Sequence, residues 1–171
     1  WDEKYEHLFS KKYFKIIRRI FFISDSFIVL STTFKKKLID WGYEKKIYLE
    51  TTIADEKYLD YVNEKYLINK YRKVDNINIL FLSRIEKTKG IYEAIDTFII
   101  LKRKIKNLKM TICGDGFELE RIKEYINQHQ ILDIKILGKV SGEDKKHAYM
   151  NSHIYFFPSY TEGMPNSVLE A

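Results

Sequence analysis

The stretch IYFFPSYTEGMPNSVLEA, residues 154–171, predicts a strand, a loop and the start of a helix. Its first residues are apolar and aromatic, as in a short buried strand. Pro165 suits a first helical turn because proline has no N–H to lose there. Asn166 and Ser167 are residue types that cap helix N-termini, where free backbone N–H groups form a site for anions. The sequence therefore predicts an anion site after this strand.

Two carboxylates flank the predicted anion site: Glu162 precedes the helix and Glu170 lies within it. Together with Gly163, Pro165 and Asn166, their spacing resembles the E-x7-E signature of retaining glycosyltransferases of the GT-B fold, the glycosyl transferases group 1 or family 4 type. For this segment alone, a capped surface helix with two incidental acids is the alternative.

A second motif, SRIEKTKG at residues 83–90, follows an apolar run at residues 77–82. Such a run is typical of a strand buried on both faces of a parallel sheet, and the residues after the motif have helical spacing. Arg84 is thus expected at the carboxyl end of a strand, the edge where open α/β sheets bind ligands. The resemblance implies that Arg84 and Lys89 hold the donor's diphosphate, with Ser83 in place of the family's usual glycine. A solvated basic loop is the alternative.

The resemblance also implies a role for each residue of these motifs. Glu162 would be the catalytic residue, holding the donor hexose and stabilising an oxocarbenium-like transition state, either as a nucleophile or as a binding group. Glu170 would accept hydroxyl groups of the ribose, and the backbone at Lys139 and Val140 would contact the base. The donor-binding set implied by the family is Arg84, Lys89, Gly163, Met164, Pro165, Asn166, Ser167 and Glu170.

Composition narrows the partners of the chain. Among 171 residues, 30 Lys and Arg against 24 Asp and Glu give a net charge of +6, which favours anionic partners such as phosphates and sugar nucleotides. No zinc-finger, RNP or helix-turn-helix pattern points to nucleic acid. No cysteine, histidine or carboxylate cluster has metal-ligand spacing. We therefore expect no cofactor and no metal, with a nucleoside-diphosphate sugar as the donor substrate.

Residues 1–23 predict a helix with an apolar and a basic side. Such a helix lies on an acidic membrane or packs on its own domain with a solvated charged face, and both alternatives stay open. No apolar run approaches the length of a membrane span, and no signal peptide is found. The prediction is a cytoplasmic protein, with peripheral contact at the inner face of the cell membrane through residues 1–23 as the open alternative.

From Ile77 onward, strands alternate with helices, which implies right-handed βαβ units and a parallel sheet. The motif Gly114-Asp115-Gly116 is either a tight strand-to-helix turn or a weak phosphate loop. Ser141–Asp144 resembles a capping box. The strands are expected at 77–83, 109–113, 134–137 and 154–157, and the helices at 91–105, 118–128 and from the capping box to about 151.

The predicted fold class is α/β: a Rossmann-like parallel sheet with flanking helices, an incomplete GT-B donor domain, preceded by the end of another Rossmann-like domain. The acceptor-side part is placed at 1–52, with strands at 27–30 and 47–49 around a helix at 33–41. An interdomain linker at 53–76 and the truncated donor domain at 77–171 follow. The resemblance implies that these residues are part of a longer enzyme and are inactive alone.

The residues and the resemblance together predict a retaining, metal-independent glycosyltransferase. It would move a hexosyl unit from a nucleoside-diphosphate sugar to a saccharide or lipid-linked acceptor. Two alternatives stay open: a GT-B sugar-nucleotide epimerase or phosphorylase, and a non-catalytic nucleotide-binding or membrane-docking module. The sequence leaves the sugar, the base and the acceptor undetermined.

Overall fold

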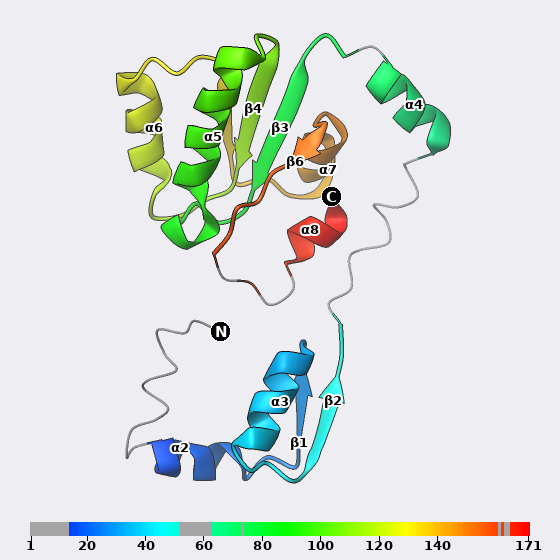
Figure 1. Ribbon diagram of the computed structural model, residues 1–171, viewed down its shortest axis with the longest axis vertical. Helices are drawn as coiled ribbons and strands as arrows, with labels where there is room; N and C mark the ends of the chain where they lie inside the picture. The colour runs from blue at the N-terminus through cyan, green and yellow to red at the C-terminus, as the bar shows by residue number, and fades with distance from the viewer. Residues whose placement is uncertain (1–13, 52–62, 73, 161, 163–164) are drawn as a thin grey trace. The chain divides into compact units, whose positions relative to one another are not determined.

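The computed structural model describes residues 14–51, 63–72, 74–160, 162 and 165–171 (Figure 1). Its contacts divide the chain into two compact units, which are described separately. The small unit comprises the described residues of Trp1–Ile53 and Thr161–Asn166, and the large unit those of Ala54–Tyr160 and Ser167–Ala171.

The small unit is built around a pair of parallel strands, β1 (Ser26–Val29) and β2 (Lys46–Leu49). Helix α3 (Thr32–Asp40) connects them, and the Ser31 side chain caps it by accepting a hydrogen bond from the Phe34 N–H. Helix α2 (Phe14–Phe21) precedes β1, so the described part of the predicted helix at 1–23 begins at Phe14. The buried residues of this unit are Val29, Leu38 and Tyr43.

The large unit contains a four-stranded, all-parallel sheet in the order β5-β4-β3-β6 (Figure 1). This order confirms the parallel α/β sheet expected from the alternation of strands and helices. β6 is shorter than the strand predicted at 154–157. The strands are β3 (Ile77–Leu82), β4 (Leu108–Cys113), β5 (Ile134–Gly138) and β6 (Ile154–Tyr155).

Helices cover both faces of this sheet. Helices α5 (Ile91–Lys104) and α6 (Leu119–Gln128) bury one face, where alternate residues of β3 and β4 such as Phe81 and Ile112 join the main core. Helix α7 (Gly142–Met150) covers the other face, where Ala148 packs with Leu80 and Cys113. Because β3 is buried on both faces, it reads as a nearly continuous apolar run.

Two local predictions need correction. Within the range predicted as a linker, residues Glu64–Arg72 form helix α4, whose Tyr66 hydroxyl donates to the Met150 carbonyl of α7 at 2.8 Å. Apolar periodicity did not indicate this helix because it buries none of its residues fully. Ser141 stands at the N-cap of α7, but its hydroxyl makes no capping hydrogen bond within the described residues. The rest of the domain division stays a prediction.

Candidate functional site

The basic loop, residues 83–90, leaves β3 at the carboxyl end of the sheet, as the sequence predicted. It is anchored at Ile85, which is fully buried and whose N–H donates to the Asp115 carbonyl at 2.9 Å. Lys87–Lys89 form a 3-10 turn that ends at Gly90, where φ is 73°. The Arg84 side chain is 68% exposed and pairs with Glu86 at 3.0 Å. The loop therefore has a fixed base and a solvent-facing guanidinium.

The glycines of the 114–116 turn contact the basic loop directly. A Cβ on Gly114 would lie 1.8 Å from the Ser83 carbonyl oxygen, and one on Gly116 would lie 2.4 Å from that of Ile85. Both glycines have positive φ, 141° and 158°. These contacts support the interpretation as a tight turn, since the space beside the glycines is filled by the basic loop.

The segment Pro158–Tyr160, which follows β6, lies against the other side of the basic loop. A Cβ on Gly90 would lie 2.0 Å from the Pro158 carbonyl oxygen. The Tyr160 N–H and the Ser159 hydroxyl both donate to the Thr88 carbonyl, at 3.0 and 3.2 Å. The basic loop is thus held between the turn after β4 and the segment after β6.

The buried residue Glu118 contacts the basic loop. Glu118 is 8% exposed, and its N–H donates to the Ile85 carbonyl at 3.1 Å. Its carboxylate accepts from the Tyr92 hydroxyl at 2.5 Å and from Arg121 at 3.0 Å. The hydrogen bond from Tyr92 lowers the pKa of Glu118, and burial together with Glu118 raises the pKa of Tyr92 to about 12. The carboxylate is therefore ionised at neutral pH and fixed between α5 and α6.

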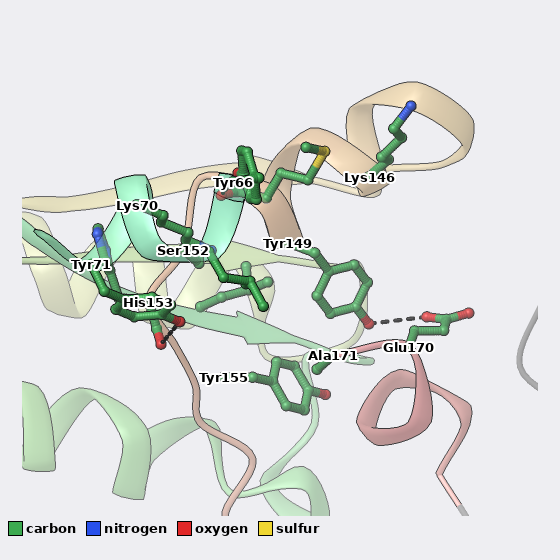
Figure 2. Close-up of a pocket in the computed structure, with 13 residues that line it drawn as sticks. Tyr66, Lys70, Tyr71, Lys146, Tyr149, Ser152, His153, Tyr155, Glu170 and Ala171 are labelled. Carbon is green, nitrogen blue, oxygen red and sulfur yellow. Dashed lines mark hydrogen bonds between the residues drawn. The ribbon is translucent and has the colours of Figure 1, made fainter. Parts of the chain in front are cut away.

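Glu170, the predicted ribose acceptor, lies in helix α8 (Asn166–Glu170) and contacts α7. The Lys145 Nζ lies 2.6 Å from its carboxylate. The Tyr149 hydroxyl donates to the same carboxylate at 3.0 Å (Figure 2). The Tyr149 hydroxyl is also 3.0 Å from the Ser167 carbonyl. Glu170 keeps 10% of its side-chain surface, so its orientation is set by α7.

Glu170 also lines a cavity of about 160 Å³. Figure 2 shows tyrosine rings from α4, α7 and β6 around it, with Lys70 and His153 at its other end. Burial lowers the pKa of both Lys70 and His153, and the nearby Lys70 contributes to the shift of His153. The cavity therefore combines aromatic walls with basic groups.

The predicted base-contacting residues, Lys139 and Val140, follow β5. Lys139 is exposed, whereas Val140 packs into the cluster of Leu80, Cys113 and Ala148. Tyr149 belongs to the same cluster, so the fold brings Val140 and Glu170 to the same helix, α7. Lys139 and Val140 also line a second, open pocket of about 400 Å³ over β4 and β5.

The remaining predicted site residues are placed in part. Glu162 is exposed and falls in the small unit, as do Pro165 and Asn166, the residue that begins α8. Ser167, in the large unit, is half-buried. The predicted donor-binding residues Gly163 and Met164 lie outside the described residues.

Sequence reasoning missed the residues that orient the predicted ones. Lys145 and Tyr149 are spaced four apart on α7 and therefore point to the same side, toward Glu170. The hydrogen bond between Tyr92 and Glu118 joins α5 to the start of α6. Their separation in the sequence follows no helix or strand period that would have predicted this contact.

The described residues contain neither a metal-binding cluster nor a membrane-spanning helix. Among them, no group of three or more His, Cys, Asp and Glu side chains is arranged to hold a metal ion. No described helix is both long and apolar enough to cross a membrane.

Known proteins provide an independent comparison. Residues 63–171 match the family described as glycosyl transferases group 1, a region that contains the basic loop, α7 and α8. The chain belongs to this family. Within the matched region, Glu170 lies in α8, shortly after the last described strand, β6.

Curated relatives agree with this membership. The chain is 27% identical over 178 residues to an uncharacterized glycosyltransferase of Methanocaldococcus jannaschii, covering 99% of this chain and 43% of the relative. It is 30% identical over 161 residues to the capsular polysaccharide biosynthesis glycosyltransferase CapM of Staphylococcus aureus, covering 88% of this chain and 41% of the relative. The chain thus spans less than half the length of these relatives.

A solved structure supports the fold. The pneumococcal O-GlcNAc transferase GtfA, in a complex with UDP and GlcNAc, matches with a TM-score of 0.65 at 20% identity, covering 85% of this chain and 28% of that one. Since the identity is low, this likeness shows the GT-B fold alone, and it confirms the fold class predicted from the sequence.

Proposed function

We propose that the protein transfers a hexosyl unit from a nucleoside-diphosphate sugar to a saccharide or lipid-linked acceptor, with retention of configuration and without a metal ion. The observation that carries the proposal is the anchored basic loop at the carboxyl edge of a sheet that matches the glycosyl transferases group 1 family. The UDP bound to the pneumococcal transferase GtfA and the role of CapM in capsular polysaccharide biosynthesis support the donor and acceptor classes.

Arg84 and Lys89 would stabilise the charge that develops on the leaving diphosphate. Charge-assisted hydrogen bonds of this kind contribute about 1.5–3 kcal/mol each. Arg84 is paired with Glu86, but an exposed ion pair contributes only about 0–1 kcal/mol, so a diphosphate can displace that carboxylate. The fixed base of the loop limits the reorganisation that binding requires.

Glu170 would accept the ribose hydroxyls. Lys145 and Tyr149 already hold its carboxylate in one orientation, which lowers the entropy lost when the nucleotide binds. The backbone at Lys139 and Val140, just before α7, would contact the base. Glu162 would hold the hexose and stabilise the positive charge of the transition state, with residues 163–167 lining the donor.

No cofactor is needed in this scheme, because the protein's cations take the role that a metal ion has in other transferases. A peripheral membrane contact through residues 1–23 is part of the proposal for lipid-linked acceptors. In its described part, Ile16 and Ile20 are 61% and 63% exposed, beside the exposed Arg18 and Arg19. Such a combination suits an anionic membrane surface.

The test uses the intact gene product. Its thermal unfolding is measured with UDP, GDP and ADP and with their sugars, and transfer is then assayed with the stabilising donor. We expect one base to raise Tm, a product that keeps the donor's anomeric configuration by NMR, and full activity in EDTA. An inverted product would overturn retention. Loss of activity in EDTA, restored by Mg²⁺ or Mn²⁺, would overturn the metal-independent scheme.

A further inference from the structure

The Glu86 carboxylate pairs with a cation of its own loop. The Arg84 guanidinium donates to Oε1 of Glu86 at 3.0 Å, and the Thr88 hydroxyl donates to Oε2 at the longer distance of 3.4 Å. All three residues belong to the basic loop and to the large unit. Both carboxylate oxygens therefore have a donor, and the charge of Arg84 is balanced within the loop itself.

The backbone of the loop brings these two side chains together. The Glu86 N–H donates to the Arg84 carbonyl at 3.0 Å, which closes a tight three-residue turn around the fully buried Ile85. The Glu86 carbonyl in turn accepts from the Lys89 N–H at 3.0 Å. The ion pair therefore forms inside a loop whose backbone is already fixed.

The two side chains, by contrast, are held weakly. Their exposed fractions are 68% for Arg84 and 24% for Glu86, and water and salt screen a pair of this kind. A diphosphate offers the guanidinium more negative charge and more acceptor oxygens than one carboxylate does. Rotation of side chains alone, with no change in the backbone, is then enough to exchange the carboxylate for a diphosphate at Arg84.

We propose that Glu86 sets the affinity of the protein for the diphosphate of its donor and of its product by competing for Arg84. The carboxylate pairs with Arg84 in the free protein, is displaced by the diphosphate, and binds the guanidinium again as the nucleoside diphosphate leaves. The inference rests on the proposed function, in which Arg84 binds the diphosphate. Because product release limits the turnover of many enzymes, such competition shortens the time for which the product occupies the site.

A role for Glu86 in orienting Arg84 would have the opposite effect on binding. Removal of an orienting carboxylate weakens the binding of a diphosphate, whereas removal of a competing one strengthens it. Glu86→Gln separates the two roles, since it keeps the size and shape of the side chain and removes its charge. Glu120→Gln is the matched control, because it removes the same charge and breaks an exposed ion pair, with Lys123 at 2.7 Å, on α6.

The experiment measures the Kd of UDP, GDP and ADP by calorimetry for the intact gene product and these variants, with Tm as a check on folding. For the nucleotide that the wild type binds, we expect Glu86→Gln to lower Kd about fivefold, the factor that corresponds to one exposed ion pair. Glu120→Gln should change Kd by less than about twofold. Inhibition of transfer by the same nucleotide should strengthen as Kd falls. An unchanged or raised Kd in Glu86→Gln would overturn the proposal.

A double-mutant cycle tests whether the effect depends on Arg84. In an Arg84→Ala background, Glu86→Gln should change Kd by less than about twofold, because the carboxylate has lost the group for which it competes. In a Lys89→Ala background the gain of about fivefold should persist. An equal gain in both backgrounds would show that Glu86 acts by general repulsion of the ligand, and would overturn competition for Arg84.

The same titrations distinguish this inference from the proposed function. If the wild type binds a nucleoside diphosphate and transfers its sugar, but Glu86→Gln does not bind the nucleotide more tightly, only the competition is wrong. If the wild type binds none of the three nucleotides, the proposed function is wrong, and the role of Glu86 falls with it.

Discussion

At the residue scale, the candidate site consists of charged groups whose partners are already in the protein. Arg84 is paired with Glu86, and Glu170 is held by Lys145 and Tyr149. A ligand must therefore replace Glu86 but finds Glu170 already oriented. This contrast predicts different consequences for substitutions in the two places.

Replacing Lys89 with alanine should lower kcat/KM by roughly 10²-fold and weaken nucleoside diphosphate binding, because one preorganised positive charge beside the leaving group is lost. The binding should also depend less on salt concentration. Lys87→Ala is the matched control, since Lys87 lies on the same 3-10 turn and is exposed. Steady-state kinetics and calorimetry measure both effects; equal effects of the two substitutions would contradict a specific role for Lys89.

Glu162→Gln and Glu170→Gln should have different kinetic effects. Loss of an interaction made in the transition state lowers kcat, so Glu162→Gln should reduce kcat with little change in nucleoside diphosphate affinity. Glu170→Gln should weaken that affinity, and it should also lower Tm because the largely buried Lys145 loses its charged partner. Initial rates, calorimetry and thermal unfolding distinguish the two, and a reversed pattern would exclude the proposed roles.

At the scale of elements, the site depends on loops that approach one another at backbone distance. The turn after β4 and the segment after β6 enclose the basic loop, and glycine at positions 90, 114 and 116 permits these contacts. These three glycines therefore allow the neighbouring segments to hold the basic loop in place. This role requires no contact between a glycine and a phosphate.

Gly90→Ala and Gly138→Ala form a matched pair at this scale, since their φ angles are 73° and 72°. A Cβ on Gly138 would meet no described heavy atom within 4 Å, so its substitution should cost about 1–2 kcal/mol for the left-handed backbone. Gly90→Ala should cost a further 1–3 kcal/mol or so, because its Cβ would collide with the Pro158 carbonyl. Urea denaturation gives both values. Equal losses would show that the Pro158 segment does not lie where the structure has it.

At the scale of the whole molecule, the family match and the division into units agree on one correction. The match begins at residue 63, just before α4, and α4 belongs to the large unit. A helix that the sequence assigned to a linker is thus part of the region shared with the family. Its tyrosines attach it by donating to the Met150 and His153 carbonyls.

The pH dependence of the free energy of unfolding should reflect the ionisation of Tyr92, Glu118 and Cys113. Burial raises the pKa of Cys113 to about 11 from 9.0, and Tyr92 reaches about 12 from 10.0, so their contributions are complete below pH 9.0 and are lost as pH rises toward those values. The lowered pKa of Glu118 has the opposite effect. The contribution of this carboxylate to the free energy of unfolding is present above pH 4.5 and is lost as the pH falls.

The free energy of unfolding should therefore be level between about pH 6.5 and 9 and decline on both sides, because the lowered pKa of His153 already reduces stability below pH 6.5. In Tyr92→Phe both declines should become shallower, since the hydrogen bond that shifts Glu118 is removed together with the tyrosine proton. Denaturation curves across this range test the prediction. An unchanged acid limb in Tyr92→Phe would show that the bond to Glu118 does not stabilise the fold.

The sequence by itself determined the alternation of strands and helices and the buried strand before Arg84, and its residues 63–171 match the family. These are local signals: apolar periodicity, turn residues and fixed spacings are all present within short windows. It predicted the parallel sheet because a helix between two strands returns the chain to the same edge of the sheet, so that both strands run in the same direction.

The tertiary structure alone decided what surrounds those signals. The partners of Glu170 lie on α7, and the contacts of Tyr160 lie in a loop and a helix about seventy positions earlier in the chain. Such contacts join residues of different elements, whose separation in sequence carries no periodicity. The same reason hid α4, which is held by tyrosine hydroxyls rather than by a buried apolar face.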